Sequence, residues 1–78
     1  MLKIMPIAAF QDNYIWSLRF NQDCIIVDPG DANPVIAHLM ENQLQLRAIL
    51  VTHHHYDHCG GVQKLSQNWN VPVYAPKN

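Results

Sequence analysis

The sequence is poor in charge and in long apolar runs, and each shortage argues against a class of protein. Charged residues make up 14% of the 78 residues and the formal net charge is −1, so no basic stripe indicates nucleic-acid binding. No apolar run approaches the roughly 20 residues that cross a bilayer. Residues 1–6 also lack the apolar core and cleavage site of a signal peptide. We therefore expect neither a nucleic-acid nor a membrane partner.

Cysteine is scarce as well, with Cys24 and Cys59 far apart and no Cys-x-x-Cys spacing. Two distant thiols do not form a disulfide framework, so reduced thiols and a cytoplasmic location are expected. Apolar residues, in contrast, make up 49% of the chain, which is enough for the core of one small domain. The sequence shows no internal repeat, linker or low-complexity segment.

Hydrophobic periodicity predicts an α/β chain in the order β-β-β-α-β-α-β. Strands are expected at residues 2–10, 14–20, 24–27, 46–51 and 71–74. Pro6 lacks an N–H group, so the first strand should lie at a sheet edge or carry a bulge. Alternation places four side chains of the second strand on one face: Tyr14, Trp16, Leu18 and Phe20. The continuous apolar run at residues 24–27 predicts a strand covered on both faces.

Two helices are expected between these strands. The first has Asn33 as its N-cap, with Pro34 at the first helical position, and ends near residues 42–43. Its apolar stripe is predicted to comprise Val35, Ile36, Leu39 and Met40, which leaves His38 on the surface. The second helix follows Gly60-Gly61, and its Trp69 is expected to belong to the core.

Four of the five histidines fall within residues 53–58, directly after the apolar strand. If this segment is extended, His53 and His55 point to one side and can bind one metal ion, while His54 points away. If the chain then turns into a helix, Asp57 and His58 can face a second ion. Imidazole and carboxylate suit zinc first, and iron or manganese also. The alternatives are a polar surface loop with accidental histidines and, for His54, a solvated or supporting position.

Asp28 follows the strand at residues 24–27, at the end where open α/β sheets place their sites. It could be a metal ligand, a hydrogen-bond partner that orients the histidine segment, or a plain turn residue. We favour the orienting role, because ligand-bearing loops usually need such support.

The His-x-His-x-Asp-His pattern at residues 53–58, after a β-β-β-α-β lead, resembles the metallo-β-lactamase superfamily. Three stretches narrow the resemblance to glyoxalase II, the hydroxyacylglutathione hydrolases: residues 13–16, 27–32 and 52–61. The resemblance implies hydrolysis of S-lactoylglutathione to lactate and glutathione. It implies that His53 and His55 bind the first metal, that Asp57 and His58 bind the second, and that Asp28 supports the loop. The two ions would activate water for attack on the thioester, so no serine or cysteine nucleophile is needed.

The resemblance also implies that residues 1–78 are the N-terminal part of a hydrolase domain, about half of an αββα sandwich. The absent part would carry a third histidine for each metal, a bridging aspartate and the residues that hold glutathione. The chain alone is therefore expected to be inactive. The alternative is a stand-alone metal-binding or interaction module that dimerises through its uncovered sheet. Lactamase or nuclease activity is less favoured.

Overall fold

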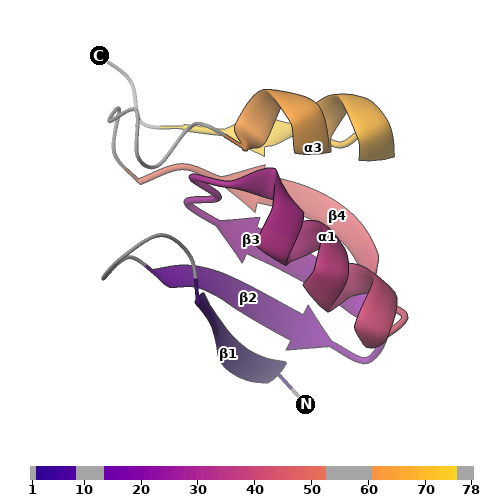
Figure 1. Ribbon diagram of the computed structural model, residues 1–78. Helices are drawn as coiled ribbons and strands as arrows, with labels where there is room; N and C mark the ends of the chain where they lie inside the picture. The colour runs from indigo at the N-terminus through magenta and orange to yellow at the C-terminus, as the bar shows by residue number, and fades with distance from the viewer. Residues whose placement is uncertain (1, 9–13, 53–60, 76–78) are drawn as a thin grey trace.

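A computed structural model of the chain describes residues 2–8, 14–52 and 61–75. The elements follow the predicted order (Figure 1). They are β1 (Leu2–Ala8), β2 (Tyr14–Phe20), β3 (Asp23–Val27), α1 (Ala32–Glu41), β4 (Gln45–Leu50), α3 (Val62–Trp69) and β5 (Val73–Tyr74). Within the described residues no helix is long and apolar enough to span a membrane.

The described strands form one five-stranded sheet in the order β1-β2-β3-β4-β5. Strands β1, β2 and β3 pair antiparallel, whereas β4 pairs parallel with β3 and β5 pairs parallel with β4. Parallel neighbours need a crossover connection, which α1 and α3 provide. Strand β1 lies at an edge of the sheet, as its Pro6 predicted.

Both helices cover the same face of the sheet. Parallel crossovers are right-handed, and β3, β4 and β5 are added in one direction, so α1 and α3 must lie on one side. Figure 1 shows both helices in front of the strands. The core lies between these layers and includes Ile15, Cys24, Ile26, Val35, Leu39, Leu46, Ile49 and Leu65.

The prediction that the strand at residues 24–27 is covered on both faces is wrong. Cys24 and Ile26 are buried under the helices, but Ile25 and Val27 are only half-buried. The other face has no covering element among the described residues, and the shared face predicted for β2 points that way. Tyr14, Trp16 and Phe20 are 56%, 42% and 52% exposed.

Helix α1 begins two residues earlier than the N-cap prediction placed it. The N-cap is Asp31, not Asn33: the Asp31 backbone is extended and its carboxylate accepts a hydrogen bond of 3.1 Å from the Asn33 N–H. Both residue types are good caps, so the pattern alone did not separate them. The prediction that Pro34 takes the first helical position is therefore wrong: Ala32 takes it, and Pro34 lies two residues later, still in the first turn, where its missing N–H removes no helical hydrogen bond.

The predicted stripe of α1 is wrong for Met40, which is 71% exposed, and the surface prediction is wrong for His38, which is half-buried. Val35 and Leu39 define the buried side of the helix. At about 100° per residue, Met40 lies about 140° round the helix from Val35, whereas His38 lies only about 60° away. The rotation therefore brings His38, and not Met40, towards the sheet.

His38 joins a polar chain that crosses the helix–sheet interface. Its Nε2 lies 3.0 Å from the hydroxyl of Ser17, which is fully buried. The same hydroxyl lies 3.0 Å from Cys24 Sγ. Burial lowers the pKa of His38, the Arg19 charge lowers it further, and Glu41 acts in the opposite direction. Burial raises the pKa of the Cys24 thiol, which is free in the structure.

We predict that the chain becomes less stable as pH falls, in part because of His38. Its pKa in the unfolded chain is about 6.5, and the folded value is lower. The unfolded state therefore binds the proton more readily, and stability is lost as pH falls from about 6.5 towards the folded pKa. Urea unfolding at a series of pH values measures this loss. The His38→Gln variant should show a shallower decline, and equal slopes in both proteins would contradict the assignment to His38.

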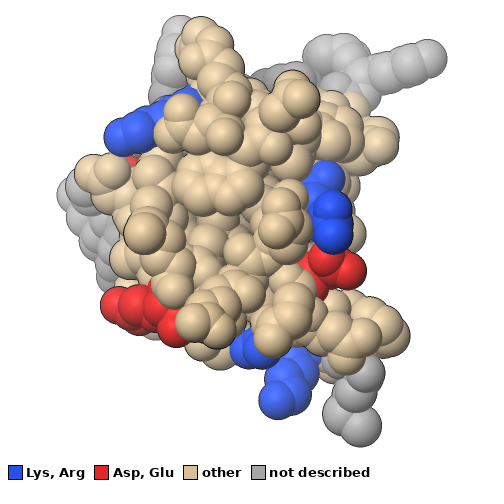
Figure 2. All heavy atoms as spheres, turned by 90° about the vertical axis from the view of Figure 1, so that its right-hand side faces the viewer, with Lys and Arg blue, Asp and Glu red and all other residues tan. Residues whose placement is uncertain are grey.

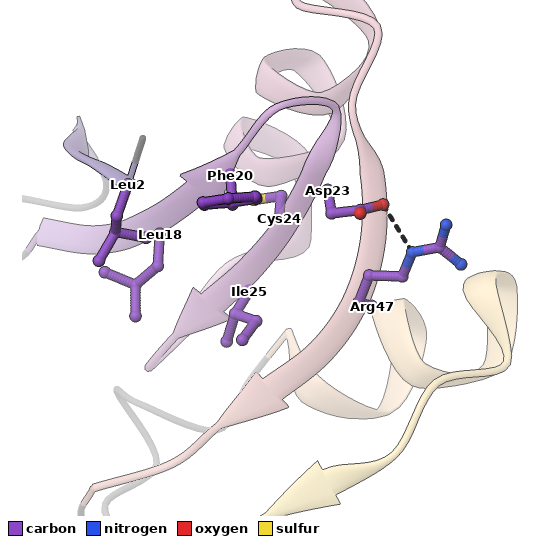
Figure 3. A pocket seen from close by; sticks show the side chains of 7 residues that line it. All are labelled: Leu2, Leu18, Phe20, Asp23, Cys24, Ile25 and Arg47. Carbon is purple, nitrogen blue, oxygen red and sulfur yellow. Dashed lines mark hydrogen bonds and ion pairs between the residues drawn. The ribbon is translucent and has the colours of Figure 1, made fainter.

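The face of the sheet opposite the helices carries exposed apolar side chains from β1 and β2. Leu2 pairs with Phe20 across β1 and β2, and Ile4 pairs with Leu18. A hollow of about 320 Å³ lies on this face, lined by Leu2, Leu18, Phe20, Asp23, Cys24, Ile25 and Arg47 (Figure 3). Arg47 donates a hydrogen bond of 2.7 Å to the Asp23 carboxylate at its margin. A different side of the molecule, in Figure 2, has uncharged side chains at its centre and charges of both signs towards its edges.

We predict that the isolated chain associates with itself through this apolar face, since each Å² of apolar surface removed from water contributes about 25 cal/mol. Sedimentation over a range of concentrations should show dimers or larger species. Ile4→Lys places a charge on the face, where Ile4 is 61% exposed, and should shift the chain towards monomer. Met40→Lys is the control, because Met40 is at least as exposed but lies on α1. A folded wild-type monomer at all concentrations would contradict the prediction.

Candidate metal site

The predicted ligands His53, His55, Asp57 and His58 lie outside the described residues, as do His54 and Cys59. The ligand set therefore stays a prediction. The structure does describe the chain on both sides of residues 53–60, up to Thr52 and again from Gly61. It also describes Asp28, the predicted supporting residue.

Strand β4 delivers the chain to this site between two neighbours. On one side, the Leu50 carbonyl accepts a hydrogen bond of 2.8 Å from the Asp28 N–H. On the other side, the Val51 N–H donates to the Tyr74 carbonyl at 2.8 Å. Since β3 and β4 are parallel, Asp28 and Thr52 follow strand ends at the same edge of the sheet. This edge is where open α/β sheets place their binding sites.

Both carboxylate oxygens of Asp28 accept hydrogen bonds from Thr52. Oδ1 accepts from the Thr52 backbone N–H at 2.7 Å, and Oδ2 accepts from the Thr52 hydroxyl at 2.5 Å. Asp28 has a φ of 55°, in the left-handed region that few residues other than glycine adopt and that Asp tolerates better than most. The carboxylate therefore holds the residue that directly precedes His53.

A second contact lies at the other side of the histidine segment. The Gly61 N–H donates a hydrogen bond of 2.8 Å to the carbonyl of Pro29, a buried residue next to Asp28. The loop between β3 and α1 thus contacts the chain both before and after residues 53–60. The sequence analysis missed the Pro29–Gly61 contact, because the Gly-Gly pair that precedes the helix is equally typical of a simple turn.

Comparison with known proteins shows which family contains this sequence and fold. Residues 11–78 match the family model described as the metallo-beta-lactamase superfamily. The chain belongs to this superfamily. It is 61% identical over 76 residues to a hydroxyacylglutathione hydrolase of Hahella chejuensis, covering 96% of this chain and 30% of the relative. It is 50% identical over 78 residues to the hydroxyacylglutathione hydrolase of Nitrosomonas eutropha, covering all of this chain and 31% of that relative.

The fold is similar to a solved member of the superfamily. A crystal structure of BLEG-1 B3 metallo-beta-lactamase superposes with a TM-score of 0.79 at 37% identity, covering 95% of this chain and 36% of that one. These findings confirm the predicted fold class and the resemblance to the hydroxyacylglutathione hydrolases. The chain spans only about 30% of the length of the curated relatives it matches.

Membership of the superfamily implies metal binding, and the donor chemistry of residues 53–58 fits it. Among residues 2–8, 14–52 and 61–75, no group of three or more His, Cys, Asp or Glu side chains is placed to hold a metal ion. The segment between them supplies imidazoles at 53, 55 and 58 and a carboxylate at 57. Neutral imidazole and carboxylate are the donors that zinc, iron and manganese accept.

We predict that His55→Ala weakens zinc binding more than His54→Ala, because only His55 shares a side with His53 in an extended segment. A zinc titration of both variants measures the difference. We expect His54→Ala to raise the dissociation constant for zinc by less than about tenfold, which is the smallest effect typical of a residue that supports a ligand. We expect His55→Ala to raise it by more than about tenfold. Equal losses would show that the histidines do not alternate.

Proposed function

We propose that this chain is the N-terminal part of a metal-dependent thioester hydrolase of the hydroxyacylglutathione hydrolase type. The reaction is S-lactoylglutathione plus water to lactate plus glutathione. The observation that carries the proposal is the identity of 50–61% to proteins of that name over essentially the whole chain. Because the chain spans about 30% of their length, the activity is proposed for a protein in which this chain is continued.

The proposed metal ligands divide into two pairs. His53 and His55 would hold one ion, and Asp57 and His58 would hold the second, with zinc the first choice and iron or manganese also suited. Two such ions, when bound, would lower the pKa of water and polarise the thioester carbonyl. No serine or cysteine nucleophile is assigned to the reaction.

Asp28 is proposed to position the ligands without binding metal. Its two oxygens fix both the backbone and the hydroxyl of Thr52, and the next residue is His53. Restraining the backbone next to a ligand narrows the directions its side chain can take. Partners of this kind typically contribute 10–100-fold to metal affinity or activity, roughly the weight we assign to Asp28.

The isolated chain is proposed to be inactive. A catalytic zinc normally has three protein ligands and an open position, whereas the assignment gives each ion two ligands here. The substrate-binding residues are expected in the part of the relatives that this chain does not match. The cytoplasm remains the expected compartment, because Cys24 and Cys59 are far apart in the sequence and do not form a disulfide framework.

Two other functions are less well supported. The uncovered apolar face fits a stand-alone interaction module, but the relatives compared above are named as enzymes. Lactamase activity is suggested by the similar solved structure, which is 37% identical to this chain. The hydroxyacylglutathione hydrolase of Hahella chejuensis is 61% identical, which favours the thioester hydrolase.

A chimera tests the proposal. Residues 1–78 would replace the matching N-terminal part of the Hahella chejuensis relative, and hydrolysis of S-lactoylglutathione would be followed by loss of thioester absorbance. We expect turnover within the ordinary enzyme range of about 1–10³ s⁻¹. The same chimera with His55→Ala should fall below about one hundredth of that rate, because a proposed ligand is lost.

A folded, metal-loaded chimera that leaves the thioester intact but opens a β-lactam would favour the lactamase function. The isolated chain with added zinc is the matched control. Turnover by that chain in the ordinary enzyme range would contradict its proposed inactivity and leave the substrate assignment standing.

A further inference from the structure

We propose that Gly61 is a positioning residue for residues 53–60, which we call the metal loop. It packs against the backbone between β3 and α1 and so holds the Asp57–His58 end of the metal loop in place. The inference rests on the proposed function, because it assigns residues 53–60 to metal binding. It adds a second point of attachment to the one that Asp28 provides at Thr52.

Gly61 is required for space, not for backbone freedom. Its φ of −95° and ψ of −7° are open to any L-residue. A Cβ at this position would lie 2.6 Å from Ala32 N, 2.7 Å from the Pro29 carbonyl oxygen and 2.8 Å from the Asp31 carbonyl carbon. All three atoms belong to the backbone, so no change of side-chain rotamer can make room. Any side chain at residue 61 must push the two segments apart.

The same approach creates a hydrogen bond that ties the loop to a helix. Gly61 is the N-cap of α3, and its N–H donates to the Pro29 carbonyl at 2.8 Å. Its own carbonyl accepts from the Leu65 N–H at 3.0 Å. Leu65 is fully buried, so the first turn of α3 is anchored in the core. Gly61 thereby fixes where the histidine segment ends relative to both α3 and the β3–α1 loop.

Neighbouring residues of one short loop thus hold both ends of the metal loop. The Asp28 side chain binds Thr52 before the segment, and the Pro29 carbonyl binds Gly61 after it. In the sequence, His53 and His55 are nearer to Thr52, and Asp57 and His58 are nearer to Gly61. A displaced Gly61 should therefore disturb the second pair more than the first.

The first test uses Gly61→Ala in the 78-residue chain. With open space at this position, replacing glycine by alanine would stabilise the chain by restricting its unfolded state. We expect the opposite: a lower urea midpoint and amide exchange at residue 61 at least about tenfold faster, with the Thr52 amide less affected. Gln63→Ala is the control, on an exposed position of the same helix. A variant as stable as wild type, with unchanged exchange, would overturn the proposal.

The second test needs no variant and separates positioning from a purely structural role. If Gly61 positions the ligands, metal binding must stabilise the Gly61 contact in return, because coupling between sites is reciprocal. Zinc sufficient to shift the His55 ring signals should slow amide exchange at Gly61 more than at Ile26, which lies in the core strand β3. Equal changes at both amides would overturn the positioning role. Failure of the proposed function would appear separately, as a chimera inert towards the thioester.

Discussion

The chain directly before His53 is held by one hydrogen-bonding arrangement, in which the Asp28 carboxylate receives both the backbone N–H and the hydroxyl of Thr52. Hydrogen bonds to a charged acceptor are about twice as strong as neutral ones, and two from one residue also fix its orientation. The arrangement is possible only because β3 and β4 run parallel as neighbours, which brings their carboxyl ends together. Sheet topology thus decides which carboxylate reaches the start of the histidine segment.

The same topology explains the asymmetry of the sheet. Strands β3, β4 and β5 follow one another across the sheet, so right-handed crossovers place α1 and α3 on a single face. The core forms there, and the opposite face keeps Leu2, Ile4 and Phe20 more than half exposed. Natural monomers rarely leave a continuous apolar surface without a function, so this face fits an interface better than a finished surface. Asp28 and Thr52, which directly precede the loop to α1 and the histidine segment, lie at the carboxyl ends of β3 and β4.

The element order could be predicted from periodicity, because strands and helices differ in the spacing of their apolar residues. Details that depend on helix rotation could not. Asp31 and Asn33 are equally good caps, and only the observed hydrogen bond to the Asn33 N–H shows that Asp31 begins α1. His38 was expected on the surface because a polar residue beside an apolar stripe usually is. Its partner, the buried Ser17, lies on β2, and no local pattern reveals so distant a contact.

The sequence predicted only part of the support for the histidine segment, residues 53–60. The spacing of Asp28 after an apolar strand predicted its orienting role, and the hydrogen bonds to Thr52 fit that role. The close packing of Gly61 against the β3–α1 loop could not be predicted, because a Gly-Gly pair before a helix equally predicts a simple turn. A glycine is needed for space when other atoms occupy the position that its Cβ would take. At Gly61 these atoms are backbone atoms of residues 29–32. The proposed ligands lie in residues 53–60, outside the described residues, so their assignment rests on residue type, alternation and family resemblance.

The residues that hold the ends of the histidine segment lie within this chain, whereas the proposed reaction would need residues beyond it. Both attachments of the histidine segment, at Thr52 and at Gly61, are made by residues 28–29, within the same 78 residues. The ends of the segment do not need further chain to be held at a fixed separation. The proposed two-ion site, in contrast, would need more donors than residues 53–58 contain, and the proposed glutathione thioester would need a binding surface of its own. About 30% of a relative's length thus contains the support for the proposed ligands of residues 53–58, while the proposed reaction would require the rest.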